Sequence, residues 1–270
     1  MNIMKINLLK NLKFHQFSSR LYGSQNGTPS LIKVYEENLV KTVVLSSPKT
    51  RNALSLTMLE ELKDNILKYN SNLRCIILKA EGSVFSSGHN LKELTGETGQ
   101  VYHNKVFESC AELMIGFTKL PFPVLAQVNG VAAAAGCQLV ASCDIVIASD
   151  KSSFMTPGAN FGIFCSTPGI PLVRNVPMKV AADMLLTGLP ISASEAFNAG
   201  LISAVVPESE LEKETKKRIE AICNKSRSVI AVGKELGGQV MVKNINMKDG
   251  QEGIRSFIEK KKPVWSHENE

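Results

Sequence analysis

The chain has 270 residues, of which 44% are hydrophobic and 21% are charged. This composition is typical of a globular protein with one large core, and it excludes a disordered or low-complexity chain. The net charge is +6, but residues 1–22 carry four basic residues and no acidic one, so that without them the charge is +2. So small an excess gives no electrostatic case for binding nucleic acid.

The leader of residues 1–22 combines Lys and Arg with Ser, Leu, Ile and Phe, and the first carboxylate of the chain is Glu36. This composition is typical of a mitochondrial transit peptide, and its lysines interrupt any apolar segment that a secretory signal would need. The sequence therefore predicts a mitochondrial matrix protein with a transit peptide over residues 1–22. The alternative is the loose N-terminal tail of a cytosolic protein.

Beyond the leader, patterns of strand and helix alternate, which predicts an α/β core. A strand pair is expected over residues 31–45 and a further strand over 73–79. The first helix, near 55–69, has the apolar residues Met58, Leu59, Leu62 and Ile66 on one face. The second, near 101–117, has Val106, Cys110, Met114 and Phe117 on one face.

The uncharged segment Leu120–Cys143 is long enough to cross a bilayer, which takes about 20 residues. It contains Pro, Asn, Gly and Gln, however, which are unfavourable in a lipid-facing helix. We therefore expect a buried strand at residues 123–128 followed by a buried helix, and no membrane span. The six cysteines form no C-x-x-C pair, which predicts reduced thiols and no metal site.

Two turns that follow expected strands have the features of an anion site. One lies in Asn129–Leu139, where small residues open a helix, and the other in Val84–Leu94, where Gly88 follows an apolar segment. Small side chains let a ligand approach free backbone N–H groups, and two such turns together could hold one oxyanion. Close packing of a buried helix would also explain the first turn.

Four segments in chain order resemble the crotonase, or enoyl-CoA hydratase/isomerase, superfamily. Val84–Leu94 is similar to its F-x-x-G-x-D-x-K-E, and Asn129–Leu139 to its N-G-x-x-x-G-G-G-C-E-L. Ser47–Leu54 resembles R-P-x-x-x-N-A-L, and Asp249–Lys261 resembles E-G-x-x-A-F-x-E-K-R. Together they cover roughly residues 30 to 265, which makes the match specific.

The resemblance implies an α/β fold with a crotonase-like ββα spiral core over residues 30–225 and a C-terminal helical region over 226–270. It also implies a homotrimer, or a hexamer of two trimers. The implied ligand is an acyl-CoA thioester, with coenzyme A as part of the ligand and no tightly bound cofactor. No nucleic-acid partner is expected, because the helix near 55–69, which is equivalent to a basic RNA-binding helix in one branch of the superfamily, carries acidic as well as basic residues.

The resemblance also assigns residues to the site. The oxyanion-hole N–H groups would be those of His89 and Ala135. Lys92, Phe257 and Lys260 fall where family members contact coenzyme A, and Lys49 or Arg51 is expected to add a phosphate contact.

The departures from the family pattern concern proton transfer. Water addition to a double bond needs a paired base and acid, and the family's two glutamates are matched here by Gln138 and Gly158. Neither residue can carry a proton. The resemblance thus predicts a protein of fatty-acid metabolism that binds acyl-CoA without classical hydratase activity. Restoring glutamate at both positions should then produce some hydratase activity.

Two alternatives remain open at this point. One is an acyl-CoA lyase, isomerase or thioesterase that relies on enolate stabilisation, with water or the His89 ring moving protons. The other is a non-catalytic scaffold subunit. Cys165 is also near the site in sequence, but no positive charge flanks it, so a buried, inert thiol is expected.

Overall fold

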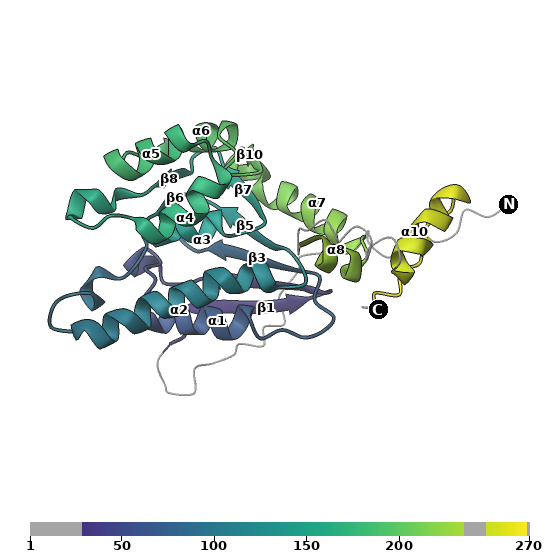
Figure 1. Cartoon of the computed structure of the whole chain (residues 1–270), viewed down its shortest axis with the longest axis horizontal. Coiled ribbons are helices and arrows are strands. Elements are labelled where there is room, and N and C mark those ends of the chain that lie inside the picture. Colours follow the sequence, from purple (N-terminus) through teal and green to yellow (C-terminus); the bar gives the residue numbers. More distant parts are fainter. Residues whose placement is uncertain (1–28, 235–246, 269–270) are drawn as a thin grey trace.

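A computed structural model describes residues 29–234 and 247–268 (Figure 1), so the predicted transit peptide lies outside the described residues. The larger of two sheets has the strand order β1-β2-β3-β5-β7-β10. It is parallel except for β1, which pairs antiparallel with β2. Its strands are β1 (Ile32–Glu37), β2 (Val40–Leu45), β3 (Cys75–Ala80), β5 (Val124–Val128), β7 (Ile145–Ser149) and β10 (Ala204–Val206).

The smaller sheet has the order β4-β6-β8-β9, in which β4, β6 and β8 are parallel and β9 is antiparallel to β8. Because β4 and β6 are parallel neighbours, the turns that follow them lie at the same edge of the sheet. Its strands are β4 (Val84–Ser86), β6 (Val131–Ala133), β8 (Ser153–Met155) and β9 (Ile191–Ser192).

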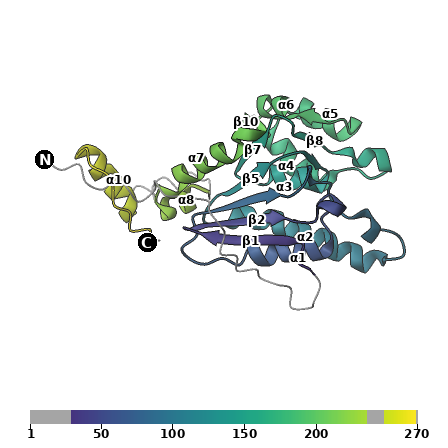
Figure 2. The ribbon, with the colours of Figure 1, turned by 180° about the vertical axis from the view of Figure 1, so that it is seen from behind.

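Helices cover both faces of the larger sheet (Figures 1 and 2). Ile76 and Leu78 of β3 join the core formed with α1 (Leu56–Ile66) and α2 (Gly99–Lys119). The alternate residues Cys75 and Ile77 join a second cluster with Leu211 of α7 (Leu211–Cys223). This alternation follows from the two-residue period of a strand and explains why residues 75–78 of β3 are all apolar.

The two helices predicted from periodicity are confirmed, and so are their buried faces. The hydroxyl oxygen of Ser55 accepts a hydrogen bond from the Met58 N–H (3.1 Å), which caps the start of α1. The buried residues of α1 are Met58, Leu59, Leu62 and Ile66, as predicted. Those of α2 include Val106, Cys110, Met114 and Phe117, also as predicted.

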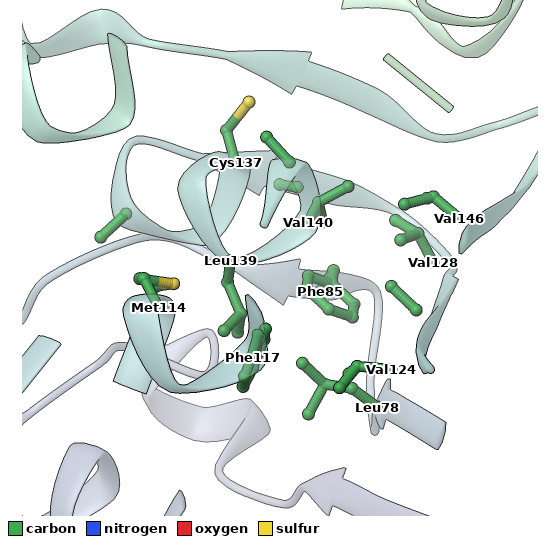
Figure 3. Packing of buried hydrophobic residues seen from close by; sticks show 14 of the residues in the cluster. Leu78, Phe85, Met114, Phe117, Val124, Val128, Cys137, Leu139, Val140 and Val146 are labelled. Atoms are coloured by element: carbon green, nitrogen blue, oxygen red, sulfur yellow. The ribbon is translucent and has the colours of Figure 1, made fainter. Parts of the chain in front are cut away.

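The smaller sheet is surrounded by short helices, and the predicted buried strand and helix within residues 120–143 are β5 and α3. Every residue of α3 is buried, and Figure 3 shows Leu139 of α3 pointing toward Phe117 of α2, with Phe85 of β4 beside them. The same hydrophobic core therefore contacts both sheets and the helix α3, which follows the turn after β6. The short helices around the smaller sheet are α3 (Ala135–Ala141), α4 (Ser166–Asn175), α5 (Met178–Thr187) and α6 (Ala193–Asn198).

The described C-terminal part consists of α8 (Arg227–Lys234), whose Lys234 amine binds the Asp144 carboxylate beside β7, and α10 (Lys248–Ile258), which lies farther from the sheets (Figure 1). Asp249 holds them together, because its buried carboxylate accepts hydrogen bonds from Ser226 Oγ (2.5 Å) and from the N–H groups of Ser266 (2.7 Å) and His267 (2.9 Å). Burial alone would raise the pKa of Asp249, but these hydrogen bonds lower it to about 2.

The described residues lack two features, a helical membrane span and a cluster of metal-ligating side chains. None of the helices there combines the length and apolarity needed to span a bilayer. The same residues contain no group of three or more His, Cys, Asp or Glu side chains placed to hold a metal ion.

Candidate functional site

The turns after β4 and β6 are in direct backbone contact. Gly88 has φ +88°, and a Cβ built there would lie 2.9 Å from the Ala133 carbonyl oxygen and 3.1 Å from the Ala135 nitrogen. A side chain at this position would push the two turns apart, and its backbone conformation favours glycine. Glycine at position 88 is therefore what allows the His89 segment to lie against the start of α3.

The N–H groups of His89 and Ala135 are both available for a ligand. Among the described residues, neither N–H donates a hydrogen bond. Ala134, between β6 and α3, has φ +49° and ψ −120°, a strained conformation for a residue with a side chain. Its own N–H is bound to the Met155 carbonyl (2.9 Å), so the strained turn leaves the next N–H, that of Ala135, unpaired.

The buried side chain of Asn52 holds the segment that leads into the turn after β4. Its side chain is fully buried, donates to the carbonyls of Glu81 (2.9 Å) and Val84 (2.8 Å), and accepts from the Ser47 N–H (2.9 Å). The Leu54 N–H donates to the Gly88 carbonyl (2.8 Å), which completes the link. The sequence showed Asn52 only as one position of a motif, because the two carbonyl groups that it binds lie 29 and 32 positions away.

The His89 ring is partly buried, and its Nε2 is shielded from solvent. It packs edge-on against Phe107 with 4.9 Å between ring centroids, and its Nδ1 lies 3.4 Å from the Leu54 carbonyl oxygen. Burial lowers the pKa of His89, although the Leu54 carbonyl and Glu93 act in the opposite direction. Within the described structure the buried Nε2 has no hydrogen-bond partner.

Glu93 is the carboxylate nearest to His89 along the chain, and its hydrogen bonds are structural. Its two carboxylate oxygens accept hydrogen bonds from the Leu56 N–H (2.9 Å), the Tyr102 hydroxyl (3.2 Å) and the Asn90 amide (3.0 Å). Glu93 therefore links its own segment to the first turn of α1.

Gln138 belongs to the same helix face as Ala135. It is only 6% exposed, and its amide oxygen Oε1 is buried with no hydrogen-bond partner in the described structure. Its own N–H donates to the Ala134 carbonyl (3.0 Å), so the first turn of α3 is regular. An unpaired buried amide oxygen is costly, and it is common where a ligand supplies the missing partner.

The loop that contains Gly158 folds back on itself. The Gly158 N–H donates to the sulfur of Cys165 (3.2 Å), and its carbonyl accepts from the Ile163 N–H (3.0 Å). A Cβ at position 158 would lie 2.2 Å from the Ile163 carbonyl oxygen and 2.6 Å from the Cys165 sulfur. The thiol therefore occupies the space that a side chain at position 158 would enter.

The thiol of Cys165 has the environment of an inert cysteine. It is buried, and burial raises its pKa, while the Gly158 N–H has a smaller opposing effect. A raised pKa leaves little thiolate at neutral pH, as the sequence predicted.

The predicted coenzyme contacts fall into two groups. Lys49, Arg51 and Lys92 are exposed on the segments joined to the Gly88 turn, and the Arg51 carbonyl accepts from the Ser87 N–H (3.0 Å). Phe257 and Lys260 instead belong to α10 and the residues after it, at the opposite end of the molecule from α3 (Figures 1 and 2). A single chain does not bring the two groups together.

A sequence model described as enoyl-CoA hydratase/isomerase matches residues 35–237. The chain belongs to this family. The enoyl-CoA hydratase domain-containing protein 3, mitochondrial, of Xenopus laevis is 54% identical over 254 residues, which are 88% of this chain and 86% of the relative. Its human counterpart is 52% identical over 263 residues, 91% and 87% of the two chains.

Solved structures of enoyl-CoA hydratase/isomerase family members confirm the predicted fold class. The crystal structure of the human enoyl-CoA hydratase domain-containing protein 3 superimposes with a TM-score of 0.84 at 51% identity, covering 87% of this chain and 100% of that one. The enoyl-CoA hydratase of Mycobacterium smegmatis gives 0.83 at 37% identity, covering 87% and 98%. The predicted α/β crotonase fold and the predicted family are therefore both correct.

Proposed function

We propose that this chain binds acyl-CoA thioesters and holds the thioester oxygen between the N–H groups of His89 and Ala135. The contact between the two turns at Gly88, which leaves both N–H groups unpaired in the described structure, carries the proposal. Two fixed donors in a site shielded from water favour an oxygen that gains negative charge, and one such donor is typically worth about 3 kcal/mol of barrier. The membership of the chain in the enoyl-CoA hydratase/isomerase family agrees with a thioester ligand.

The proposal includes the loss of classical hydratase activity. Gln138 retains the shape of a glutamate but cannot accept a proton, and Gly158 has no side chain. The loop around Gly158 has also closed on Cys165, so the space for a second carboxylate is filled. Without a paired acid and base near the thioester, water addition has no proton carriers.

The remaining coenzyme contacts are proposed to come from two copies of the chain in a trimer or a hexamer. Lys92, with Lys49 or Arg51, would contact the coenzyme from the copy that holds the thioester, while Phe257 and Lys260 would come from a neighbouring copy. Exposed large apolar side chains support assembly, because a neighbouring copy would shield them from water. They lie exposed from η3 (Pro157–Phe161) to the end of α5 and on α10: Phe161, Phe164, Met178, Leu186, Phe257 and Ile258.

The proposed location is the mitochondrial matrix, where acyl-CoA thioesters of fatty-acid metabolism would be the available ligands. The relatives from frog and human carry the word mitochondrial in their names. The acid-free, basic leader of this chain has the composition of a transit peptide.

Titration calorimetry combined with mass spectrometry tests the proposal. Purified protein is mixed with saturated, enoyl and malonyl thioesters of coenzyme A, and both the binding heat and the product masses are recorded. We expect saturable binding and no hydration of the enoyl thioester. Failure to bind any thioester would refute the proposal, and a hydrated product would refute its second part.

His89 favours a second candidate function, that of an enzyme which stabilises an enolate and moves one proton with the histidine ring. The buried Nε2 has no partner in the described structure, and the lowered pKa keeps the ring neutral and able to accept a proton. Any new product mass in the same experiment that disappears in the His89→Gln variant would support this candidate, because that variant retains the backbone N–H.

A further inference from the structure

Residues 263–268 form a strap that is bound to the carboxylate of Asp249. The N–H groups of Ser266 and His267 donate to this carboxylate, which lies in the first turn of α10 (2.7 and 2.9 Å). The same carboxylate accepts from the hydroxyl of Ser226, the residue before α8 (2.5 Å). One buried carboxylate thus connects the strap, α10 and the start of α8, so the position of α10 depends on how firmly the strap is bound.

The strap carries Trp265, the single tryptophan of the chain. Its indole N–H donates to the Asn224 carbonyl at the end of α7 (3.0 Å). Its ring lies against α10, where a Cβ added at Gly253 would be 3.4 Å from the ring. These contacts leave the side chain partly buried. The fluorescence of Trp265 therefore reports whether the strap is bound.

His267 has a strained backbone and a ring that accepts a hydrogen bond. Its φ of +61° lies in the left-handed region, which is unfavourable for a residue with a side chain and persists only where the surroundings impose it. Its Nδ1 accepts from the Arg227 N–H at the start of α8 (3.5 Å). A ring nitrogen that accepts carries no proton, so this contact requires the neutral ring.

The charged groups around the His267 ring disfavour a positive charge on it. Burial is the largest effect and lowers the pKa of His267, and the guanidinium groups of Arg74, before β3, and of Arg227 lower it further. The Asp249 carboxylate acts in the opposite direction. Because the bound ring has the lower pKa, a released strap takes up a proton more readily than a bound one.

The other titratable groups of this cluster keep their charge state near neutral pH. Burial raises the pKa of the Cys223 thiol at the end of α7, although Arg74 acts in the opposite direction, so the thiol stays uncharged. Lys248 of α10 forms an ion pair with Glu268 of the strap (2.6 Å). The Asp249 carboxylate, with a pKa of about 2, stays ionised. Among these groups, His267 is the one whose charge changes between pH 8 and pH 5.

We propose that the strap of residues 263–268 is a pH-sensitive latch, closed while the His267 ring is neutral and opened when the ring is protonated. A proton on Nδ1 would set a donor against the Arg227 N–H and a cation beside two arginines. Opening would also relieve the left-handed backbone at His267. It would remove two donors from Asp249 and free α10, which carries Phe257, to change its position. The latch does not depend on the proposed thioester site.

The emission of Trp265 in the full protein, recorded between pH 8 and pH 5, tests the proposal. We expect the emission to shift to longer wavelength and its quenching by acrylamide to increase, beginning as the pH falls through about 6.5, the value of a released histidine. Far-UV circular dichroism should stay constant over the same range. An unchanged emission would overturn the proposal, and so would a shift that coincides with a loss of circular dichroism, because global unfolding would then explain it.

Three variants show whether His267 operates the latch. His267→Gln still offers an acceptor to the Arg227 N–H but takes up no proton, so its Trp265 emission should not depend on pH. His103→Gln, on α2, is the matched control and should behave like the wild type. Asp249→Asn removes the charge that holds the strap, so its emission should lie at long wavelength already at pH 8.

A pH-dependent shift that persists in a folded His267→Gln variant would overturn the proposal, because the ring would not be its source. Loss of the shift in His103→Gln would overturn it as well. The wild-type curve remains decisive against the latch even where a variant fails to fold, since it needs no substitution.

Discussion

Two glycines, Gly88 and Gly158, both occupy positions with no room for a Cβ, but they have opposite effects on the candidate site. At Gly88 the crowding comes from Ala133 and Ala135, and the glycine lets two turns meet so that their N–H groups can serve a common ligand. At Gly158 the crowding comes from Ile163 and Cys165 of the same loop. At Gly88 the close approach of two turns forms the candidate site. At Gly158 the close approach of Cys165 fills the space that a side chain would occupy.

The comparison separates two requirements of thioester chemistry. Backbone donors depend on how turns pack, and the enoyl-CoA hydratase/isomerase fold supplies them here with no help from side-chain chemistry. In the proposed function, proton transfer would depend on the side chains at positions 138 and 158, which are an amide and a hydrogen atom. Under that proposal different residues control thioester binding and proton transfer, so one can be present without the other.

The largest loss of stability is expected from a substitution at Gly158, where Ile163 and Cys165 occupy the space that a side chain would enter. In a Gln138→Glu, Gly158→Glu double variant, the new Cβ at position 158 would lie 2.2 Å from a backbone oxygen, so the loop must move. We expect a loss of about 3 kcal/mol in the free energy of unfolding, measured by urea denaturation. We also expect no hydratase activity, contrary to what the sequence alone suggested.

The Gln138→Glu single variant is the control for the double variant, since it changes the charge without touching the loop. Hydration of crotonyl-CoA by the double variant, followed by loss of its ultraviolet absorbance, would show that the Gly158 loop opens easily. That result would remove the distinction between the two glycines.

A smaller loss of stability but a larger loss of binding is expected from Gly88→Ala. The variant places a side chain at φ +88° and against the Ala135 nitrogen, which should cost about 2 kcal/mol and separate the two N–H groups. Gly162→Ala is the matched control, because Gly162 also has a positive φ of 74° but has no atom within 4 Å of the added Cβ. It should lose about 1 kcal/mol and bind acyl-CoA normally. Equal binding by the two variants would contradict the role assigned to Gly88.

The parts of this structure that sequence predicts well are those that depend on local periodicity. The buried faces of α1 and α2 follow from apolar residues three and four positions apart, and Met58, Leu62 and Phe117 are buried as expected. The buried helix that begins within Asn129–Leu139 was also predictable, because small residues after a strand are typical of close packing. In these cases each residue's environment is set mainly by its near neighbours in the chain.

The parts that escaped prediction depend on contacts between segments. Nothing local shows that the His89 ring packs on Phe107, or that the Gly158 loop returns to Cys165. Family motifs also give residue types without giving their place in the fold, as Phe257 illustrates, because it lies on α10 away from α3 (Figure 1). Packing between segments, rather than local sequence, decides these features.

The smallest expected effect is the pH dependence of stability that comes from the His89 ring. Burial lowers the pKa of His89 in the folded protein, so the unfolded chain binds a proton more readily. Stability should therefore decrease as the pH falls through the unfolded value of about 6.5, and it should stop decreasing below the folded pKa. Urea denaturation between pH 8 and pH 5 measures this, with the His89→Gln variant expected to show a shallower decrease.

His267 must be separated from this effect, because burial lowers its pKa as well. His267→Gln should flatten the same curve by its own share, and the double variant should flatten it further, since the two residues lie in different parts of the fold and their effects should add. If His89→Gln leaves the pH dependence unchanged, the ring is not a buried neutral base. The second candidate function would then lose the observation that favours it, while the backbone donors, which do not depend on the ring, would still support thioester binding.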